Sequence, residues 1–336
     1  MKRKYKRLSK FVFLIFCTLL IGCGVNTKEE QETDTIKIGI AIYRVEDPFV
    51  ASIYKEIEEK VIQKEEEIGK KILLNMVDAK NNQGNQNNQV DEFINKRYDV
   101  ICVNLVDRTA AALIIAKAKE ADIPIVFFNR EPVSKDMDIW NSTYYVGSDS
   151  KQAGQLAGEL VLEAYEKDPI GVDKNNDGVL QYVMLEGEQG HPDALIRTEY
   201  SVKRILEQGV QLEKLASGTA NWMRSPAYEL MLGWIREYGS QIEVVIANND
   251  EMAIGALEAI DEYIMMDPIV IGTDGIESGL EKVEKGLMYG TVVNDAPLQA
   301  EKILDLAIAS VQGETNGMSR IVKTGHHKIT QENLTK

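Results

Sequence analysis

The sequence has little cysteine, no excess of basic residues and no phosphate-binding glycine loop. Three Cys among 336 residues are too few for a disulfide framework. The hydrophobic share of 44% and the charged share of 27% are average for globular proteins, which excludes collagen-like and wholly disordered chains. Neither GxGxxG nor GxxxxGK[ST] occurs, and this absence disfavours nucleotide binding.

The charge is unevenly distributed along the chain. The formal net charge is -15, but the first 22 residues contain six Lys and Arg and no acid. The remainder has 32 basic and 53 acidic residues, a net charge of -21. A body this acidic repels phosphate backbones, so we expect no nucleic-acid partner.

The N-terminus has the pattern of an export signal. Residues 1–10 are basic, and residues 11–21 form an apolar run that is too short to span a membrane comfortably. The run ends in Leu20-Ile21-Gly22-Cys23, which is similar to a bacterial lipobox. We therefore predict a signal peptide over 1–22, lipidation of Cys23, a polar tether over 23–35 and a lipid anchor on the extracytoplasmic face of the membrane. A plain signal peptide with an incidental Cys is the alternative.

The other cysteines fit this interpretation. Cys17 leaves with the signal peptide, and Cys102 lies within the apolar run 100–106. No disulfide can then form within the mature chain. We expect Cys102 to be a small buried hydrophobic residue.

Short β-rich apolar runs alternate with helical stretches from residue 36 onward. Helical spacing of apolar residues is clear at 110–119, 194–208 and 253–263. This alternation is typical of parallel α/β sheets, and the number of strands favours two doubly wound lobes over one. The predicted strands are 36–43, 72–77, 100–106, 123–128, 144–147, 180–185, 210–215, 244–247, 269–272 and 290–293.

Polar side chains recur just beyond the carboxyl ends of these strands, where open α/β sheets form their ligand crevices. They include Asp47, Asn129, Asn249 and Asp274. Any one of them alone would be interpreted as a helix cap or turn residue. Together with an Arg, amides and carboxylates suit vicinal sugar hydroxyls, and aromatic side chains can cover the C–H faces of a pyranose. The candidate aromatic residues are Phe49 and Trp222, which core packing would also explain.

Residues 173–181 follow the spacing of a calcium loop. Asp173, Asn175, Asp177 and Gln181 supply side-chain oxygens at positions 1, 3, 5 and 9, and Val179 supplies a carbonyl at position 7. Met184 occupies position 12, where an acid is usual. The segment is either a calcium loop that borrows a carboxylate from elsewhere or an Asx-rich turn.

Several long strings resemble the bacterial periplasmic galactose/glucose-binding proteins that serve ABC importers. They are IY at 42–43 with Asp47 and Phe49, VFFN at 126–129, YYVG at 144–147, GE at 187–188, GHPDA at 190–194, EVVIANND at 243–250 and GTVVND at 290–295. The resemblance covers nearly the whole mature chain.

The resemblance implies a sugar site and completes the calcium loop. In the sugar site, Phe49 and Trp222 match the aromatic faces, Arg197 matches the guanidinium donor and His191 matches the imidazole contact. The other matching contacts are Tyr43, Asp47, Asn129, Asp193, Asn249, Asp274 and Asn294. Glu243 matches the distant glutamate that completes the structural calcium site.

The resemblance also implies two lobes joined by three crossings near 147–148, 294–296 and 323–325. The first lobe would comprise 36–146 plus 296–322, and the second 147–295 plus 323–336. We expect a monomeric, non-enzymatic protein that captures D-galactose or D-glucose and delivers it to an ABC permease. The lipobox indicates a Gram-positive cell. A sugar-sensing accessory protein for a chemoreceptor or sensor kinase remains the alternative. His326 and His327 are expected to be exposed and without a role.

Overall fold

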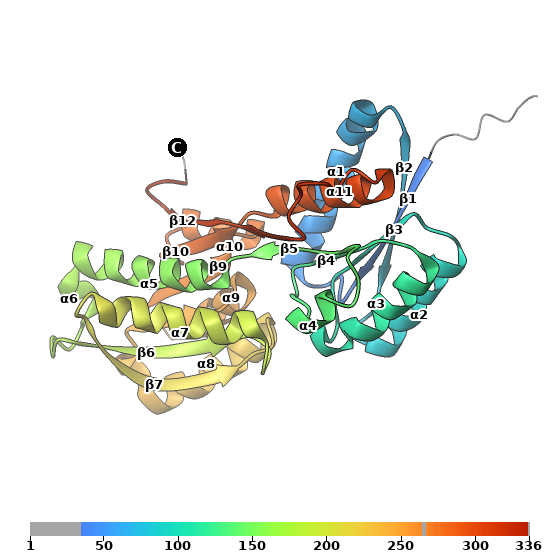
Figure 1. Ribbon diagram of the computed structural model, residues 1–336. Helices are drawn as coiled ribbons and strands as arrows, with labels where there is room; N and C mark the ends of the chain where they lie inside the picture. The colour runs from blue at the N-terminus through green and yellow to red at the C-terminus, as the bar shows by residue number, and fades with distance from the viewer. Residues whose placement is uncertain (1–34, 264–266, 335–336) are drawn as a thin grey trace, which may run out of the picture. The chain divides into compact units, whose positions relative to one another are not determined.

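The computed structural model describes residues 35–263 and 267–334, which form two α/β lobes (Figure 1). The predicted signal peptide, Cys23 and nearly all of the tether lie outside the described residues. No helix within the described ranges is long and apolar enough to cross a membrane.

Each lobe is built on a six-stranded sheet. The first sheet has the order β11-β5-β4-β3-β1-β2, and the second has the order β12-β10-β9-β8-β6-β7. The first sheet consists of β1 (Thr35–Ile42), β2 (Lys71–Asp78), β3 (Val100–Val103), β4 (Ile125–Phe128), β5 (Thr143–Ser148) and β11 (Ile321–Thr324). The second consists of β6 (Val179–Glu186), β7 (Gln211–Thr219), β8 (Val244–Ala247), β9 (Ile269–Asp274), β10 (Gly290–Asn294) and β12 (His326–Thr330). In the second sheet β12 runs antiparallel to β10.

Helices cover both faces of each sheet, as a parallel sheet requires. In the first lobe these helices are α1 (Pro48–Ile68) and α11 (Ala296–Gln312) on one face and α2 (Gln83–Asn95) and α3 (Ala111–Ala121) on the other. In the second lobe they are α5 (Ser150–Lys167) and α7 (Pro192–Glu207) opposite α8 (Arg224–Tyr238) and α9 (Asp250–Asp261). The shorter helices are η1 (Arg108–Ala110), α4 (Ser134–Met137), α6 (Pro169–Val172), η2 (Gly239–Gln241) and α10 (Glu277–Glu284).

The predicted fold class is confirmed, and all ten predicted strands are present. The prediction missed β11 and β12. These two strands are short and rich in polar residues, so they lack the apolar run by which the other strands are found. The third predicted strand was too long, because it ends at Val103. The Asn104 side chain then turns to donate to the carbonyl of Phe128.

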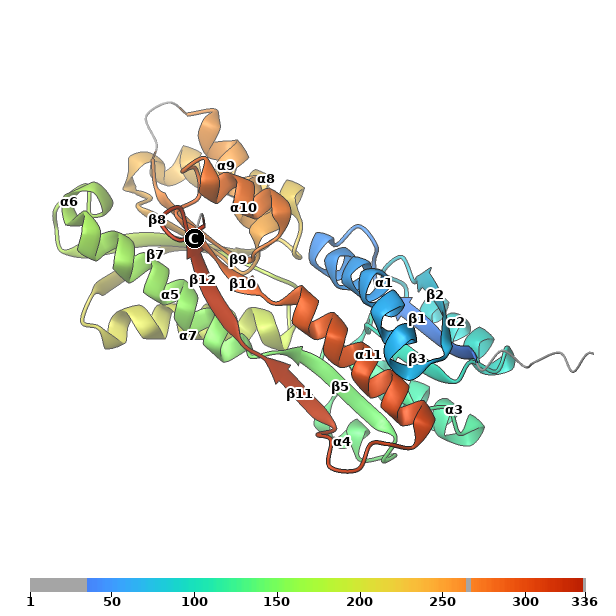
Figure 2. The ribbon, with the colours of Figure 1, turned by 90° about the horizontal axis from the view of Figure 1, so that it is seen from above.

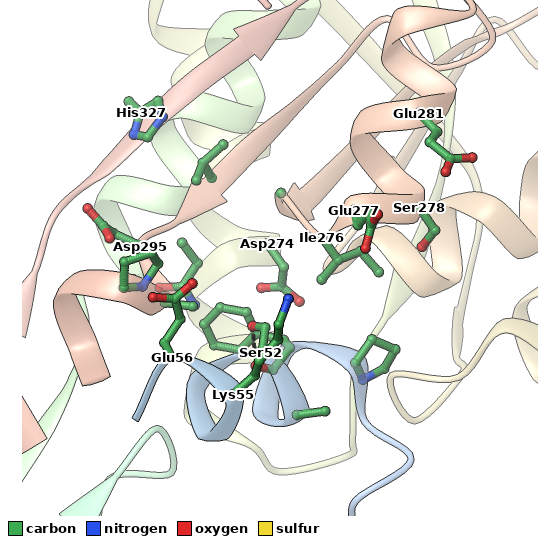
Figure 3. Close-up of a pocket in the computed structure, with 18 residues that line it drawn as sticks. Ser52, Lys55, Glu56, Asp274, Ile276, Glu277, Ser278, Glu281, Asp295 and His327 are labelled. Carbon is green, nitrogen blue, oxygen red and sulfur yellow. Dashed lines mark hydrogen bonds between the residues drawn. The ribbon is translucent and has the colours of Figure 1, made fainter. Parts of the chain in front are cut away.

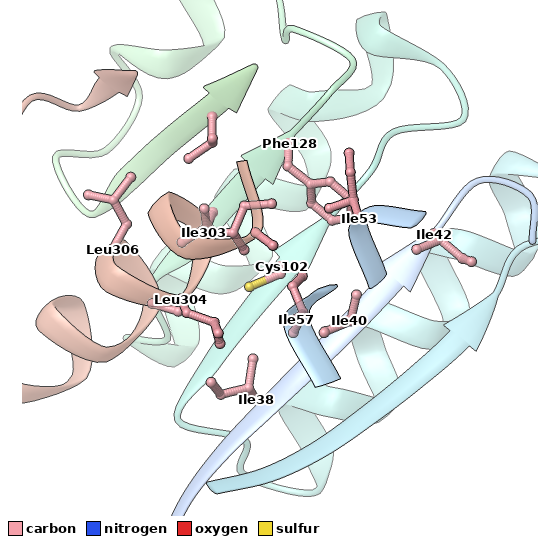
Figure 4. Packing of buried hydrophobic residues seen from close by; sticks show 14 of the residues in the cluster. Ile38, Ile40, Ile42, Ile53, Ile57, Cys102, Phe128, Ile303, Leu304 and Leu306 are labelled. Carbon is pink, nitrogen blue, oxygen red and sulfur yellow. The ribbon is translucent and has the colours of Figure 1, made fainter. Parts of the chain in front are cut away.

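The core of the first lobe follows the two-residue period of β1. Ile38, Ile40 and Ile42 point toward α1 and α11 (Figure 4), whereas Ala41 packs with α2 and α3. Cys102 is fully buried beside these isoleucines, as predicted. Burial raises the pKa of its thiol to about 12, so the thiol stays protonated and acts as a small hydrophobic group.

The chain crosses from one lobe to the other at three single residues. Asp149 separates β5 from α5, Asp295 separates β10 from α11, and Gly325 separates β11 from β12. Figure 2 shows β11 continuing into β12 beside the point where β5 leads into α5. The first sheet extends to Ser148 and Thr324, two residues beyond the predicted lobe boundaries at 146 and 322.

His326 lies at the third crossing, and the prediction that it is exposed was wrong. Its side chain is buried with 8% exposure, whereas His327 is exposed. Alternation along β12 explains the difference, because neighbouring side chains point to opposite faces. The pKa of His326 is lowered to about 3, mainly by burial. The charges of Arg197 and His327 add to this lowering, and those of Asp149 and Asp193 oppose it.

We predict that His326 makes the protein less stable in mild acid. The unfolded chain binds a proton at this side chain below about pH 6.5, whereas the folded chain resists protonation until about pH 3. The free energy of unfolding therefore falls as the pH drops through this window. Between about pH 7 and about pH 5 the loss due to His326 is about 2 kcal/mol.

Urea denaturation at the two pH values measures this loss. The His326→Gln variant is expected to lose about 2 kcal/mol less than wild type on acidification. His327→Gln is the matched control and should behave as wild type does. Equal losses in wild type and His326→Gln would contradict the prediction.

Candidate functional site

A cavity lies between the lobes, at the carboxyl ends of strands from both sheets. The first lobe contributes residues that follow β1 and β4, and the second contributes residues that follow β6, β7 and β8 or end β9. This is the edge at which open α/β sheets bind ligands. The lining residues are Tyr43, Asp47, Phe49, Asn129, Arg130, His191, Asp193, Arg197, Trp222, Asn249 and Asp274. The structure thus brings together every predicted sugar contact except Asn294.

The Asp47 carboxylate is fixed at the start of α1. Its Oδ1 atom accepts hydrogen bonds from the N–H groups of Phe49 at 3.0 Å and Val50 at 3.1 Å. Its Oδ2 atom accepts from the Tyr43 hydroxyl. Burial and the Asp47 charge raise the pKa of Tyr43, so its phenol remains a donor. Oδ1 thus caps α1, while Oδ2 bonds to Tyr43, which also lines the cavity.

Asn129 is positioned by a buried amide below it. Asn129 follows β4 in the left-handed region, with φ of 58°. The Asn104 side chain, which is fully buried, donates to Asn129 Oδ1 at 3.1 Å. Asn104 also accepts from the backbone N–H of Tyr43 at 3.3 Å, so it ties the ends of β1 and β4 together.

His191 is the N-cap of α7 and faces the cavity as a neutral side chain. Its Nδ1 accepts from the N–H of Asp193 at 3.2 Å, which assigns the ring proton to Nε2 and leaves Nε2 as a donor. Burial lowers the pKa of His191 to about 4, and the neighbouring Arg130 and Arg197 contribute to the shift. The ring packs edge-on against Trp222 with a centroid distance of 5.3 Å.

Trp222 is held in place through its backbone. It adopts a φ of 64°, which is rare for a bulky residue, and the preceding Asn221 adopts 53°. Asn249 Nδ2 donates to the Trp222 carbonyl at 3.3 Å. Asn249 Oδ1 accepts from the N–H of Met252 at 3.0 Å and so caps α9. A single amide therefore fixes both a helix start and the aromatic wall.

Arg197 and Asp274 form a buried ion pair in the second lobe. Arg197 Nη1 lies 3.3 Å from Asp274 Oδ1 and donates to the carbonyl of Asn248 at 2.7 Å. Burial raises the pKa of Asp274 to about 7, while the Arg197 charge opposes this shift. The nearby Asp250 is fully buried and has a raised pKa for the same reason. The Arg197 guanidinium thus favours the ionised form of the buried Asp274 carboxyl.

Close helix packing places Arg197. A Cβ atom at Gly154 would lie 2.8 Å from the Arg197 carbonyl oxygen, and one at Gly158 would lie 2.5 Å from that of Ser201. Because both residues are glycine, α5 can approach the backbone of α7. This contact sets α7, and with it Arg197, against the end of the second sheet.

Arg130 is a cavity residue that the sequence analysis missed. Its guanidinium carbon lies 3.9 Å from the centroid of the Tyr43 ring, and the side chain is 7% exposed. The available signal was its position directly after Asn129, just beyond a predicted strand. A lone Arg at such a position is usually solvated, so nothing in the local sequence distinguishes Arg130 from an exposed residue.

Asn294 lies outside this cavity, in the adjoining cleft of about 820 Å³ between the start of α1 and α10 (Figure 3). It is 2% exposed, and its Oδ1 accepts from Gln299 Nε2 at 2.6 Å. Its buried amide nitrogen has no hydrogen-bond partner among the described residues, but it lies near Asp274 and weakly opposes the burial that raises the pKa of that carboxyl. Asn294 therefore supports a cavity residue and does not itself line the cavity.

The predicted calcium loop and Glu243 come together at the far end of the second sheet. Glu243 Oε1 accepts from the N–H of Lys174 at 2.7 Å, and its Oε2 accepts from that of Gln181 at 3.0 Å. The distant glutamate thus reaches the loop. Asp173 accepts from the N–H groups of Asp177 and Gly178.

The loop side chains are also linked to one another. Asn175 Nδ2 donates to Gln181 Oε1 at 3.0 Å, and Gln181 Nε2 donates to Asp177 Oδ2 at 3.0 Å. Within residues 35–263 and 267–334, no group of three His, Cys, Asp or Glu side chains has the spacing of a preformed metal site. The donor set suits a hard cation, but a cation would have to replace these hydrogen bonds.

The cavity combines aromatic walls with donors and acceptors for hydroxyl groups. Phe49 belongs to the first lobe and Trp222 to the second, so the two aromatic side chains come from opposite sides. Carboxylates accept from hydroxyls, guanidinium groups donate, and amides do both. This arrangement suits a polyhydroxylated ring that touches both lobes.

Comparisons with known proteins agree with this geometry. The sequence profile described as periplasmic binding protein domain matches residues 38–315. The D-galactose/methyl-galactoside binding periplasmic protein MglB of Haemophilus influenzae is 37% identical over 308 residues, which cover 89% of this chain and 90% of that protein.

Two solved structures share the fold. An ABC transporter solute binding protein from Bacillus halodurans with bound myo-inositol has a TM-score of 0.75 and 31% identity, and the match covers 91% of this chain and 98% of that chain. A periplasmic solute binding protein from Actinobacillus succinogenes with bound D-allose has a TM-score of 0.79 at 23% identity, and the match covers 89% and 99% of the two chains.

Proposed function

The chain belongs to the periplasmic binding protein domain family, and from this premise we propose that it captures D-galactose or D-glucose between its lobes. We propose further that it delivers the sugar to an ABC permease outside the cytoplasm. The named relatives are binding proteins, and one of them is a D-galactose/methyl-galactoside binding protein. Binding without turnover is therefore the activity we infer.

The observation that carries this proposal is the composition of the cavity wall. Phe49 and Trp222 can stack on the two faces of a pyranose, as aromatic side chains do with C–H surfaces. Asp47, Asp193 and Asp274 provide acceptors, and Arg197 and His191 provide donors.

The hinge follows from the three crossings. Residues Asp149, Asp295 and Gly325 are the points at which the chain leaves one lobe for the other. A ring that touches Phe49 in one lobe and Trp222 in the other makes its full set of contacts only when the lobes close. Such differential contact is what shifts a hinge equilibrium toward the closed state. The closed form would be the form that the permease recognises.

Calorimetric titration with D-galactose, D-glucose, D-ribose and L-arabinose tests the ligand. Sugar carried through purification is removed first. We expect the hexoses to bind at least about tenfold more tightly than the pentoses, because polar groups of the cavity would be left unpaired by the smaller sugars. An absence of heat with both hexoses would contradict the proposed ligand.

Asp47→Asn is the variant that tests the site. It keeps an oxygen to cap α1 but removes the carboxylate charge, so we expect an affinity loss of about 10-fold to 100-fold with little change in stability. Asp107→Asn is the matched control, since Asp107 caps η1 through Oδ1 but does not line the cavity.

We propose that the loop at 173–181 binds structural Ca²⁺. The ligands would be Asp173, Asn175, Asp177, Gln181, Glu243 and the Val179 carbonyl. Support comes from the hydrogen bonds that join Glu243 to the loop backbone. The cation would supply charge neutralisation for three carboxylates gathered at one turn.

Thermal unfolding with and without Ca²⁺ tests this site. At a Ca²⁺ concentration about 100 times the Kd, we expect a stabilisation of about 2.7 kcal/mol relative to chelator-treated protein. Asp173→Asn and Glu243→Gln should abolish the difference. Asp168→Asn, which alters the neighbouring cap of α6, should preserve it. Equal melting temperatures with Ca²⁺ and with chelator would contradict the proposal.

We propose that Cys23 carries the lipid anchor of a Gram-positive lipoprotein. Cell fractionation of a Cys23→Ser variant measures this directly. Wild-type protein should partition with membranes, and the variant should be lost from them because it lacks the acyl chains. Cys17→Ser, within the predicted signal peptide, should leave the partitioning unchanged. Membrane retention of Cys23→Ser equal to wild type would contradict the proposal.

A further inference from the structure

Arg130 is held on the first lobe by two neighbours. Its guanidinium stacks on the Tyr43 ring at 3.9 Å from the centroid, and Nη1 donates to the carbonyl of Val106 at 2.9 Å. The side chain is 7% exposed. The planar guanidinium can stack with its face and donate along its edges at the same time. The remaining edge, at Nη2, lies beside a residue of the second lobe.

Glu188 meets that edge from the second lobe. Its Oε2 atom lies 2.8 Å from Arg130 Nη2 and is buried there without a hydrogen bond to any described residue, although the Glu188 side chain as a whole is 38% exposed. Glu188 begins a tight turn after β6, in which the N–H of His191 donates to the Glu188 carbonyl at 3.0 Å. Gly190, at the third position, has a φ of 77°, which favours glycine. The turn therefore fixes Glu188 relative to His191, which lines the cavity.

The turn is also anchored to the sheet beneath it. The N–H of Gly187 donates to Asn248 Oδ1 at 3.1 Å, and Asn248 directly follows β8. Arg130 likewise lies two residues beyond the end of β4, directly after Asn129. Each partner of the ion pair is thus attached to the end of a central strand in its own lobe. The pair can form only when these two strand ends approach each other.

We propose that the Arg130–Glu188 ion pair is an inter-lobe latch that holds the closed state and slows release of the bound sugar. The inference rests on the proposed function. Tyr43 and Val106 hold the Arg130 side chain from within its own lobe. Separation of the lobes removes its carboxylate partner but leaves those contacts in place. Attraction between the two opposite charges at this distance stabilises the arrangement in which the pair forms.

Glu188 is the informative position, because it does not line the sugar cavity. Its replacement by Gln keeps the size of the side chain and removes the charge. If the pair is a latch, the loss appears mainly in the dissociation rate, because the pair forms only once the lobes have closed and affinity changes are mostly changes in dissociation. If Glu188 only supports the turn, Gln should support it equally well.

The test is a double-mutant cycle of Glu188→Gln and Arg130→Gln, read by the dissociation rate of D-galactose in stopped-flow tryptophan fluorescence. We expect Glu188→Gln to speed dissociation about tenfold in the wild-type background and by less than about twofold in the Arg130→Gln background. Asp91→Asn, which breaks the Lys117–Asp91 pair within the first lobe, is the matched control and should leave the rate unchanged.

Two results separate failure of the latch from failure of the sugar assignment. If wild type binds D-galactose and Glu188→Gln leaves the dissociation rate within about twofold of wild type, the latch is overturned and the function stands. If wild type binds neither hexose, the proposed ligand fails. Small-angle scattering of the ligand-free proteins then decides the latch. A larger radius of gyration for Glu188→Gln supports it, and equal radii overturn it.

Discussion

Parallel strands must all end at the same edge of their sheet, and the functional site depends on this constraint. Each lobe directs the carboxyl ends of its strands toward the other lobe, so the residues after β1, β4, β6 and β8 meet in one cavity. Helices cover both faces of the sheets. The cavity is therefore lined mainly by segments that lead from strand to helix and by the first turns of those helices.

The same segments must also start helices, and the cavity uses this requirement. Asp47, His191 and Asn249 are the N-caps of α1, α7 and α9, and each accepts from an N–H group of the first turn. A cap fixes a side chain in one rotamer while leaving a second polar atom free to point elsewhere. The groups that face the ligand are thus already ordered, which lowers the entropic cost of binding.

Most of this arrangement could be predicted from the sequence because it rests on local patterns. The strands are apolar runs, and Asp47 and Asn249 each lie a few residues beyond the end of such a run. What escaped prediction depends on tertiary contacts that leave no local pattern. Arg130 becomes a buried residue only because Tyr43 lies beneath it and Glu188 arrives from the other lobe. His326 is buried because β12 pairs with β10, and β12 itself was too polar to be found.

Asn294 and the calcium loop mark two further limits of sequence reasoning. Asn294 does occupy the end of β10, as its motif predicts. Its Oδ1 accepts a hydrogen bond from Gln299, and its amide nitrogen lies near Asp274. In the loop, the spacing of the oxygen atoms predicts a cation, whereas the hydrogen bonds show how the same atoms can satisfy one another. Spacing fixes which groups meet. It does not fix which of their hydrogen bonds are formed.

The division of the aromatic walls between lobes joins recognition to movement. Neither lobe has both Phe49 and Trp222, and neither has both Arg130 and Glu188. A ligand held by one lobe alone would lose one stacking face and leave the ion pair unformed. Full recognition of a ring therefore requires the approach of the lobes, and that approach brings together charges that stabilise it. Under the proposed function, ligand binding and closure of the lobes are coupled, because these contacts exist in one arrangement of the hinge only.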